Sequence, residues 1–170
     1  GNWAAEAKRF TPDIKVLVHH GPSRSTGPEL ASNLRASDLV ITTYGTAVRD
    51  ITELGNTKWD RVVLDEAQVI KNHRSATAKE LRKLDSRIRL ALTGTPIENG
   101  LGDLWAIMDF CNPGLVGGRT SFINQLNQMD EADEVAESAL HALNGVLVFR
   151  RTKTEPLIAA ELPDRIDELA

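Results

Sequence analysis

The sequence predicts an α/β fold in which helices flank a parallel sheet, followed by an appended helical subdomain. Short apolar runs alternate with helical patterns as far as Leu92, which is typical of parallel strands joined by crossover helices. Two of these runs end in polar turns, at Asp65 and at Thr93, as expected at the carboxyl edge of such a sheet. From Gly117 onward the strand patterns stop and helical patterns continue.

Composition limits the classes of function. With 170 residues, 41% of them hydrophobic, the chain is one domain or a large part of one and can bury a core. Cys111 is the only cysteine, which excludes an internal disulfide and fits a reducing compartment. We find no signal peptide and no apolar run of membrane length, so we expect no membrane partner. The net charge of −4 does not indicate nucleic-acid binding, although residues 71–89 are basic and could form either a phosphate-contacting or an ordinary solvated face.

The first elements are expected from periodicity and turn residues. A helix is predicted over residues 2–10, where Trp3, Ala7 and Phe10 share one face, and a strand over residues 14–18. The adjacent histidines that follow this strand could suggest a metal site or a general base. No third ligand lies near them in sequence, so a turn at the end of the strand is the better interpretation.

The middle of the chain alternates between helix and strand. We expect a helix over 27–35, a strand over 38–41, a helix from Thr43 as N-cap to about residue 54, and the central strand over 59–64. Thr43 is a suitable N-cap because its hydroxyl can accept a hydrogen bond from a free N–H of the first helical turn.

The later elements change from mixed to helical. A helix over 75–84 with Asn72 as its cap precedes a strand over 87–92, and further helices are predicted over 101–110, 121–128 and 131–148. The last of these begins near the letters DEAD at residues 130–133. No buried strand precedes that string, so we interpret it as the acidic first turn of a helix.

Asp65 and Glu66 are the main candidates for chemistry. They follow the valine-rich run 61–64, and two carboxylates at the end of a buried strand would be costly inside a core. At a sheet edge, Asp65 could hold Mg²⁺ and Glu66 could orient or deprotonate a water that attacks a phosphate. A strand ending in solvated acids is the plain alternative, and the second polar turn at Thr93 argues against it.

With these residues assembled, the chain resembles the first motor lobe of the Swi/Snf-like ATPases of helicase superfamily two. The resemblance covers most of the chain. Its strongest parts are Asp65-Glu66-Ala67-Gln68, similar to motif II, and Leu92-Thr93-Gly94-Thr95-Pro96-Ile97-Glu98-Asn99, similar to motif III. Weaker parts are Asn2-Trp3, His20-Gly21, Ile41-Thr42-Thr43-Tyr44 (motif Ib) and Phe149-Arg150-Arg151-Thr152-Lys153 with Leu162-Pro163. Gln68 and Glu98 depart from the residues that many relatives have, histidine and glutamine.

The resemblance implies a RecA-like fold of the P-loop NTPase type. Residues 1–112 would be a partial ATP-binding lobe, 113–148 a helical protrusion, and 149–170 a basic exit segment that returns to the lobe. The full protein would hydrolyse ATP with Mg²⁺ and translocate along duplex DNA, with a second RecA-like lobe as partner. It would lie in the cytoplasm, associated with the nucleoid in a bacterium, or in the nucleus of a eukaryote.

The resemblance also implies residue roles. Asp65 would hold Mg²⁺ and Glu66 would position the attacking water. The residues expected near the nucleotide are Gln68, Thr93, Gly94 and Thr95, and those expected at DNA are Thr42, Thr43, Tyr44, Arg150, Arg151 and Lys153. A packing role for the last three is an equal alternative.

No GxxxxGK[ST] loop occurs among the 170 residues, so by resemblance the lobe is truncated. We therefore expect the isolated chain to have no useful ATPase activity. In the family the strand before that loop lies next to the motif III strand, so residues 87–92 would have an unpaired apolar edge and the chain could self-associate.

Three other functions remain open. A degenerate lobe could act as a DNA- or protein-binding scaffold without hydrolysis, although the intact pair Asp65 and Glu66 argues against it. The chemistry could instead belong to a restriction-type or RNA-directed helicase. A plain metal-dependent hydrolase is disfavoured because no further carboxylate or histidine cluster completes a site.

Overall fold

The computed structural model describes residues 2–95, 100–129 and 147–149. Contacts divide the chain into two compact units, residues 1–124 and 125–170. The boundary expected between residues 112 and 113 stays a prediction. The strands and most helices belong to the first unit.

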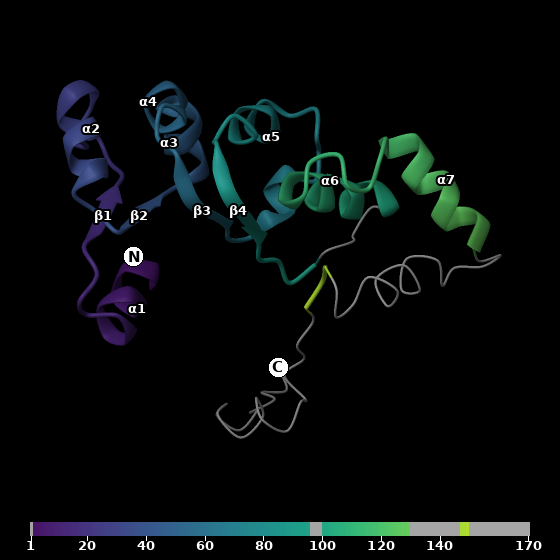
Figure 1. The fold of residues 1–170 in the computed structure, drawn as a ribbon, viewed down its shortest axis with the longest axis horizontal. Coiled ribbons are helices and arrows are strands. Elements are labelled where there is room, and N and C mark those ends of the chain that lie inside the picture. The colour runs from purple at the N-terminus through teal and green to yellow at the C-terminus, as the bar shows by residue number, and fades with distance from the viewer. Residues whose placement is uncertain (1, 96–99, 130–146, 150–170) are drawn as a thin grey trace, which may run out of the picture. The chain divides into compact units, whose positions relative to one another are not determined.

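All strands of the described residues pair in parallel, as predicted (Figure 1). β1 (Val16–His19) pairs with β2 (Leu39–Thr42), and β3 (Trp59–Leu64) pairs with β4 (Ser86–Ala91). We expected one continuous sheet, whereas no ladder joins the two pairs within the described part of the chain. Side chains connect them instead, because residues of both pairs pack on the same buried cluster.

The helices cover the strands unevenly. In the view of Figure 1, α2 (Gly27–Arg35), α3 (Tyr44–Arg49), α4 (Ile51–Gly55) and α5 (Ala76–Leu81) lie above the strands and α1 (Asn2–Phe10) lies below them. The core consists of apolar side chains from α2, α3, α4 and α5, from β3 and the turn after it, and from Leu84 and Phe110 further along the chain. Its buried members are Leu30, Leu34, Ala47, Leu54, Leu64, Ala67, Ile70, Ala78, Leu81, Leu84 and Phe110.

The predicted helix over residues 43–54 is two helices. Thr43 is the N-cap of α3, and its hydroxyl accepts a hydrogen bond from the Thr46 N–H at 3.3 Å, as expected. Asp50 then ends α3 and begins α4 with non-helical backbone angles, φ −105° and ψ 25°. The break coincides with a buried ion pair of the Asp50 side chain, which periodicity does not reveal.

The helix predicted over residues 75–84 is shorter, and its N-cap is Ser75 rather than Asn72. The Ser75 hydroxyl accepts from the Ala78 N–H at 3.1 Å. The helix ends at Leu81, and just beyond it the carbonyl oxygens of Arg82 and Leu84 accept hydrogen bonds from the Arg89 guanidinium.

Helix α6 (Leu101–Cys111) follows the second polar turn and is buried on several sides, including Leu104 and Phe110. Helix α7 (Arg119–Met129) begins earlier than predicted. Most of the helix expected over 131–148 lies outside the described residues, as does the DEAD string. Its last two residues, Leu147 and Val148, are described and are not helical. No helix within the described ranges has the length and apolar character needed to span a membrane.

Candidate functional site

The two polar turns meet at the carboxyl ends of β3 and β4. The parallel register places Leu64 beside Ala91, and the ladder continues past the strands because the Leu92 N–H donates to the Leu64 carbonyl at 2.7 Å. The Ala67 N–H then donates to the Leu92 carbonyl at 2.8 Å. The acids after β3 and the threonines after β4 are therefore neighbours, as the sequence predicted.

The turn that carries the acids has an unusual backbone. Glu66 is the only non-glycine residue with a positive φ, 49°, among the residues that the structure describes. Left-handed backbone at a glutamate costs free energy and occurs preferentially at functional sites. Both Asp65 and Glu66 are exposed to solvent, so the strand ends in accessible carboxylates.

A chain of hydrogen bonds joins Glu66 to the second turn. Gln68, in the 3₁₀-helix η1 (Ala67–Ile70), donates through Nε2 to Glu66 Oε2 at 2.8 Å. The Thr93 hydroxyl donates to Gln68 Oε1 at 3.0 Å, and the Thr95 N–H donates back to Thr93 Oγ1 at 3.2 Å. Gln68 thus links the two turns directly through its side-chain amide. Gly94 lies between the two threonines, while Glu98 lies outside the described residues.

Two aromatic residues from distant segments hold Asp65. The indole of Trp3 in α1 donates to Asp65 Oδ2 at 2.7 Å. The hydroxyl of Tyr44 in α3 donates to the Asp65 main-chain carbonyl at 2.6 Å. Burial of the Tyr44 ring, together with the negative charges of Asp65 and Glu66, raises the pKa of its hydroxyl to about 12. Sequence reasoning found neither contact, because the pairs are 62 and 21 residues apart.

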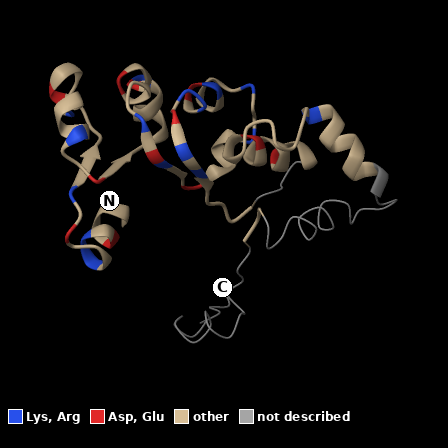
Figure 2. Cartoon of the chain, viewed as in Figure 1, with Lys and Arg blue, Asp and Glu red and all other residues tan. Residues whose placement is uncertain are grey.

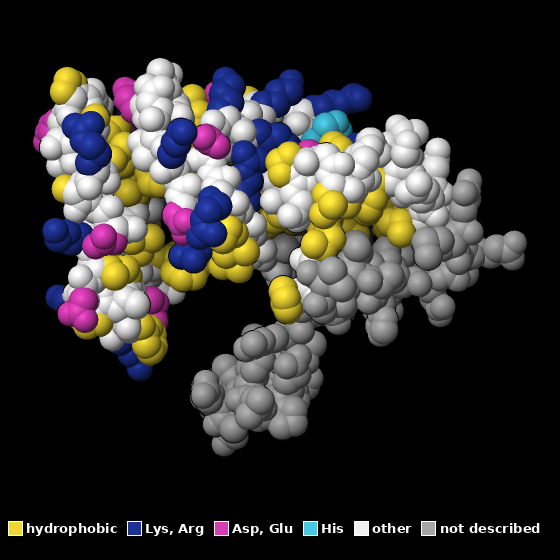
Figure 3. Space-filling model, viewed as in Figure 1, with side chains coloured by type: hydrophobic (Ala, Val, Ile, Leu, Met, Phe, Trp, Pro, Cys, Tyr) yellow, Lys and Arg dark blue, Asp and Glu magenta, His cyan; other side chains and the backbone are white. Residues whose placement is uncertain are grey.

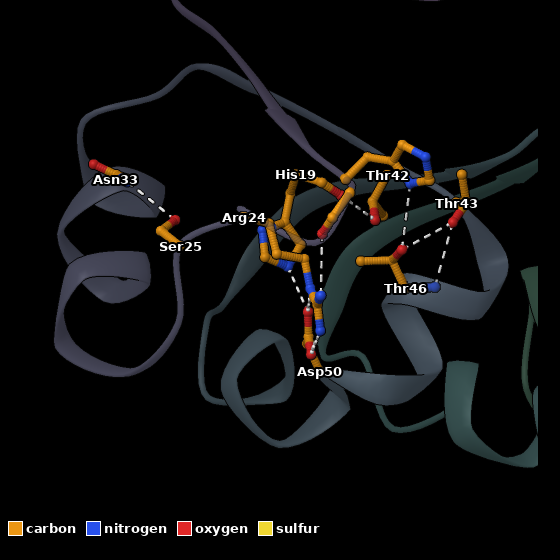
Figure 4. Close-up of polar contacts among 10 residues, drawn as sticks. His19, Arg24, Ser25, Asn33, Thr42, Thr43, Thr46 and Asp50 are labelled. Carbon is orange, nitrogen blue, oxygen red and sulfur yellow. Dashed lines mark hydrogen bonds and ion pairs between the residues drawn. The ribbon is translucent and has the colours of Figure 1, made fainter.

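The threonines expected at DNA lie at the carboxyl end of β2 (Figure 4). The Thr42 hydroxyl donates to the His19 carbonyl at 2.8 Å, which ties the end of β2 to the end of β1. Thr43 is exposed, and its hydroxyl caps α3. Arg150, Arg151 and Lys153, the other residues expected at DNA, lie outside the described residues.

A buried ion cluster anchors the elements next to these threonines (Figure 4). Arg24 makes two hydrogen bonds to Asp50, from Nε to Oδ2 and from Nη2 to Oδ1 at 2.5 and 2.8 Å. His19 Nε2 lies 2.7 Å from Asp50 Oδ2. His19 is the last residue of β1 and is 1% exposed, so the pair of histidines marks a strand end, as interpreted from the sequence.

The cluster predicts how stability depends on pH. The hydrogen bond from Arg24 holds the pKa of Asp50 at about 2, below its ordinary value of 3.8, and the contact with His19 acts in the same direction against the effect of burial. A lowered pKa stabilises the fold above the ordinary pKa, and this contribution is lost as the pH falls toward 2. We expect the difference in unfolding free energy between the native protein and Asp50→Asn to shrink between pH 4 and pH 2, as measured by urea unfolding. A constant difference would contradict this.

Most basic residues of the stretch 71–89, whose positions along the chain are blue in Figure 2, contact partners within the chain. Arg87 contacts Asp60 at 2.7 Å, Lys83 contacts Glu80 at 2.7 Å and Arg82 contacts Asp109 at 3.5 Å. Lys71 Nζ lies 3.7 Å from Asp103, and Arg89 has no ion pair among the described residues but donates to main-chain carbonyls. Among the described lysines and arginines of this stretch, only the side chains of Arg74 and Lys79 have neither an ion pair nor a hydrogen bond. These pairs favour an ordinary protein surface over a phosphate-binding face for this stretch.

A cavity of about 630 Å³ lies at the opposite, amino-terminal end of β4. Its lining residues are Ser86, Arg87, Arg89, Cys111, Asn112, Pro113, Gly114 and Leu115. The two arginines that could attract a ligand there are engaged with Asp60 and with main-chain carbonyls. The exposed carboxylates at the other end of the strands are the better candidate for chemistry.

Comparisons with known proteins agree with this geometry. The family model of the SNF2-related domain matches residues 1–170. The chain is 38% identical over 170 residues to the "Putative ATP-dependent helicase/translocase YwqA" of Bacillus subtilis, covering 99% of this chain and 18% of that protein. It is 33% identical to the human lymphoid-specific helicase, covering 96% of this chain and 21% of that protein.

A solved structure of the same family is also similar to this chain. The Sulfolobus solfataricus SWI2/SNF2 ATPase core in complex with dsDNA matches with a TM-score of 0.77 and 39% identity, over 95% of this chain and 33% of that one. The chain therefore spans about a fifth of the two relatives and a third of the solved core. The match confirms the predicted fold class, a RecA-like α/β lobe. The chain belongs to the SNF2-related domain family.

Proposed function

We propose that the protein containing this chain hydrolyses ATP and uses the cycle to translocate along duplex DNA. The observation that carries the proposal is the hydrogen-bonded chain from Thr93 through Gln68 to the exposed carboxylate of Glu66. Such a chain connects a catalytic acid to a turn that can respond to nucleotide or to lobe closure. The Sulfolobus ATPase core, of the same fold, is described in complex with dsDNA, which supports duplex DNA as the partner.

Asp65 fits a role in holding Mg²⁺. Its carboxylate is exposed, and a hard oxygen ligand of this kind, one or two per ion, is what Mg²⁺ uses beside substrate phosphates. When bound, Mg²⁺ would neutralise charge on the phosphate oxygens. The Trp3 indole orients the Asp65 carboxylate through Oδ2, and the Glu66 N–H donates to Oδ1 at 3.0 Å. The described residues contain no group of three or more His, Cys, Asp or Glu that could hold a metal by itself, so substrate phosphates would complete the ligand set.

Glu66 is the residue we assign to the attacking water. Its carboxylate is accessible, and Gln68 Nε2 restrains one oxygen while the other stays available for water. Gln68, which binds this acid, and Thr93, Gly94 and Thr95 of the second turn would lie beside the nucleotide. Thr42, Thr43 and Tyr44 would lie at the DNA backbone, a contact independent of sequence and sensitive to salt.

The test is ATP hydrolysis by the full-length protein with and without duplex DNA. We expect hydrolysis to be stimulated by duplex DNA and the stimulation to fall with added salt. The chain alone should show no useful turnover, since it lacks a phosphate-binding loop and the arginine finger of a second lobe, the latter worth about 10³–10⁵ in rate. Binding of DNA without hydrolysis by the full-length protein would instead favour a scaffold.

We also propose that the isolated chain self-associates through β4. Among the described strands β4 pairs with β3 alone, and apolar side chains gather at the surface near the ends of both strands (Figure 3). Val63 and Leu90 are partners across the ladder and are 50% and 45% exposed, and Leu92 is 41% exposed. Open, apolar strand edges favour pairing with a second chain.

Light scattering tests the proposed association. We expect the average mass of the chain to rise with concentration and Leu90→Lys to reduce this rise, because a lysine on the exposed face opposes pairing. Ser32→Lys, on the exposed side of α2, is the matched control and should leave the association unchanged. A chain that stays monomeric at high concentration would contradict the proposal.

A further inference from the structure

Tyr44 lies between the turn expected at DNA and the turn that carries the acids. It is the first residue of α3, directly after the N-cap Thr43, and it is the only tyrosine in the chain. Its hydroxyl donates to the main-chain carbonyl of Asp65 at 2.6 Å. One side chain therefore connects two segments that are 21 residues apart in sequence.

The bond is placed where it controls the orientation of Glu66. The peptide group between Asp65 and Glu66 is held at both ends: Tyr44 binds its carbonyl oxygen, and the Asp65 carboxylate accepts from its N–H at 3.0 Å. The orientation of that peptide sets the φ angle of Glu66, which is 49°. Because this left-handed angle is unfavourable for glutamate, contacts that hold the peptide are needed to maintain it.

The ring and the backbone of Tyr44 are also held in place. Its ring is half-buried against the core, and its backbone begins a helix that Thr43 caps. At the far end of α3, Asp50 is held by Arg24 and His19. Helix α3 is thus held by side-chain contacts at both of its ends.

We propose that Tyr44 is a positioning residue that transmits contact at Thr42 and Thr43 to the peptide that aims Glu66. The inference rests on the proposed function, in which those threonines touch DNA and Glu66 positions the attacking water. DNA bound at the threonines would shift the start of α3, and the Tyr44 hydroxyl would move the Asp65 carbonyl with it. Stimulation of hydrolysis by DNA would then depend on this hydroxyl.

The experiment compares Tyr44→Phe with the native full-length protein in duplex-stimulated ATP hydrolysis. We expect the stimulated kcat to fall about tenfold, the equivalent of one hydrogen bond lost from the transition state. The DNA concentration that gives half of the maximal stimulation should change less than about twofold, because the threonines remain. If Tyr44 had a purely structural role, Tyr44→Phe would not lower the stimulated kcat while leaving the half-saturating DNA concentration nearly unchanged.

Two outcomes would overturn this inference and leave the proposed function intact. One is stimulated hydrolysis that is equal in Tyr44→Phe and the native protein. The other is an unchanged kcat with a raised half-saturating DNA concentration, which would leave Tyr44 with the proposed DNA contact but no role in positioning Glu66. Absence of stimulation in the native protein would instead overturn the proposed function, and the inference with it.

Trp59→Phe provides the matched control. Trp59 is also half-buried and donates from its ring to a main-chain carbonyl, that of Leu54 at 3.0 Å, away from the acids. We expect this variant to be less stable but to keep the native ratio of stimulated to basal rate.

Discussion

Glu66→Gln is expected to reduce ATP hydrolysis by the full-length protein roughly 10²- to 10⁴-fold, the range for loss of a positioned general base. The amide cannot take a proton from water, although it keeps the size of the carboxylate. Phosphate release under saturating ATP and duplex DNA measures the effect. Glu66 is exposed, so the melting temperature should change little.

The control for this variant is Glu29→Gln. Glu29 is an exposed glutamate in the first turn of α2 and has the same change in charge and shape. Native turnover in Glu29→Gln with lost turnover in Glu66→Gln would assign the effect to the acid turn. Turnover within about twofold of native in Glu66→Gln would show that this carboxylate does not act on the water.

Asp50→Asn is expected to lower the free energy of unfolding by about 3 kcal/mol, because removing one partner leaves another charge buried without compensation. Arg24 has a side chain that is only 13% exposed, and His19 is almost fully enclosed, so water cannot replace the lost carboxylate easily. Urea unfolding measures the change. The loss should appear in the midpoint and leave the slope unchanged.

Asp60→Asn is the matched control for Asp50→Asn. Asp60 also pairs with two arginines, Arg61 and Arg87, but the side chains of all three are more than half exposed. Exposed pairs contribute little, because water screens them and long side chains lose entropy in pairing. Equal losses of stability in the two variants would mean that burial of Asp50 does not determine its contribution.

Local patterns were sufficient for most of the fold. The helices over 2–10 and 27–35 and the strand over 59–64 have the bounds that periodicity predicts, and Thr43 caps α3 as expected. These features depend on residues close in sequence: the spacing of apolar side chains and a hydroxyl within reach of a free N–H. The sequence also predicted that the two polar turns are neighbours, because the carboxyl ends of adjacent parallel strands lie at the same edge of a sheet.

The sequence alone thus determined the fold class, the family and the position of the acids. Tertiary structure decided how those acids are held: Trp3 on the Asp65 carboxylate, Tyr44 on the Asp65 carbonyl, and the break of the helix at Asp50. Each involves partners at least 21 residues apart, and no local preference encodes such a meeting. Their positions follow only when the helices pack on one core and bring distant hydrogen-bonding groups within 3 Å of each other.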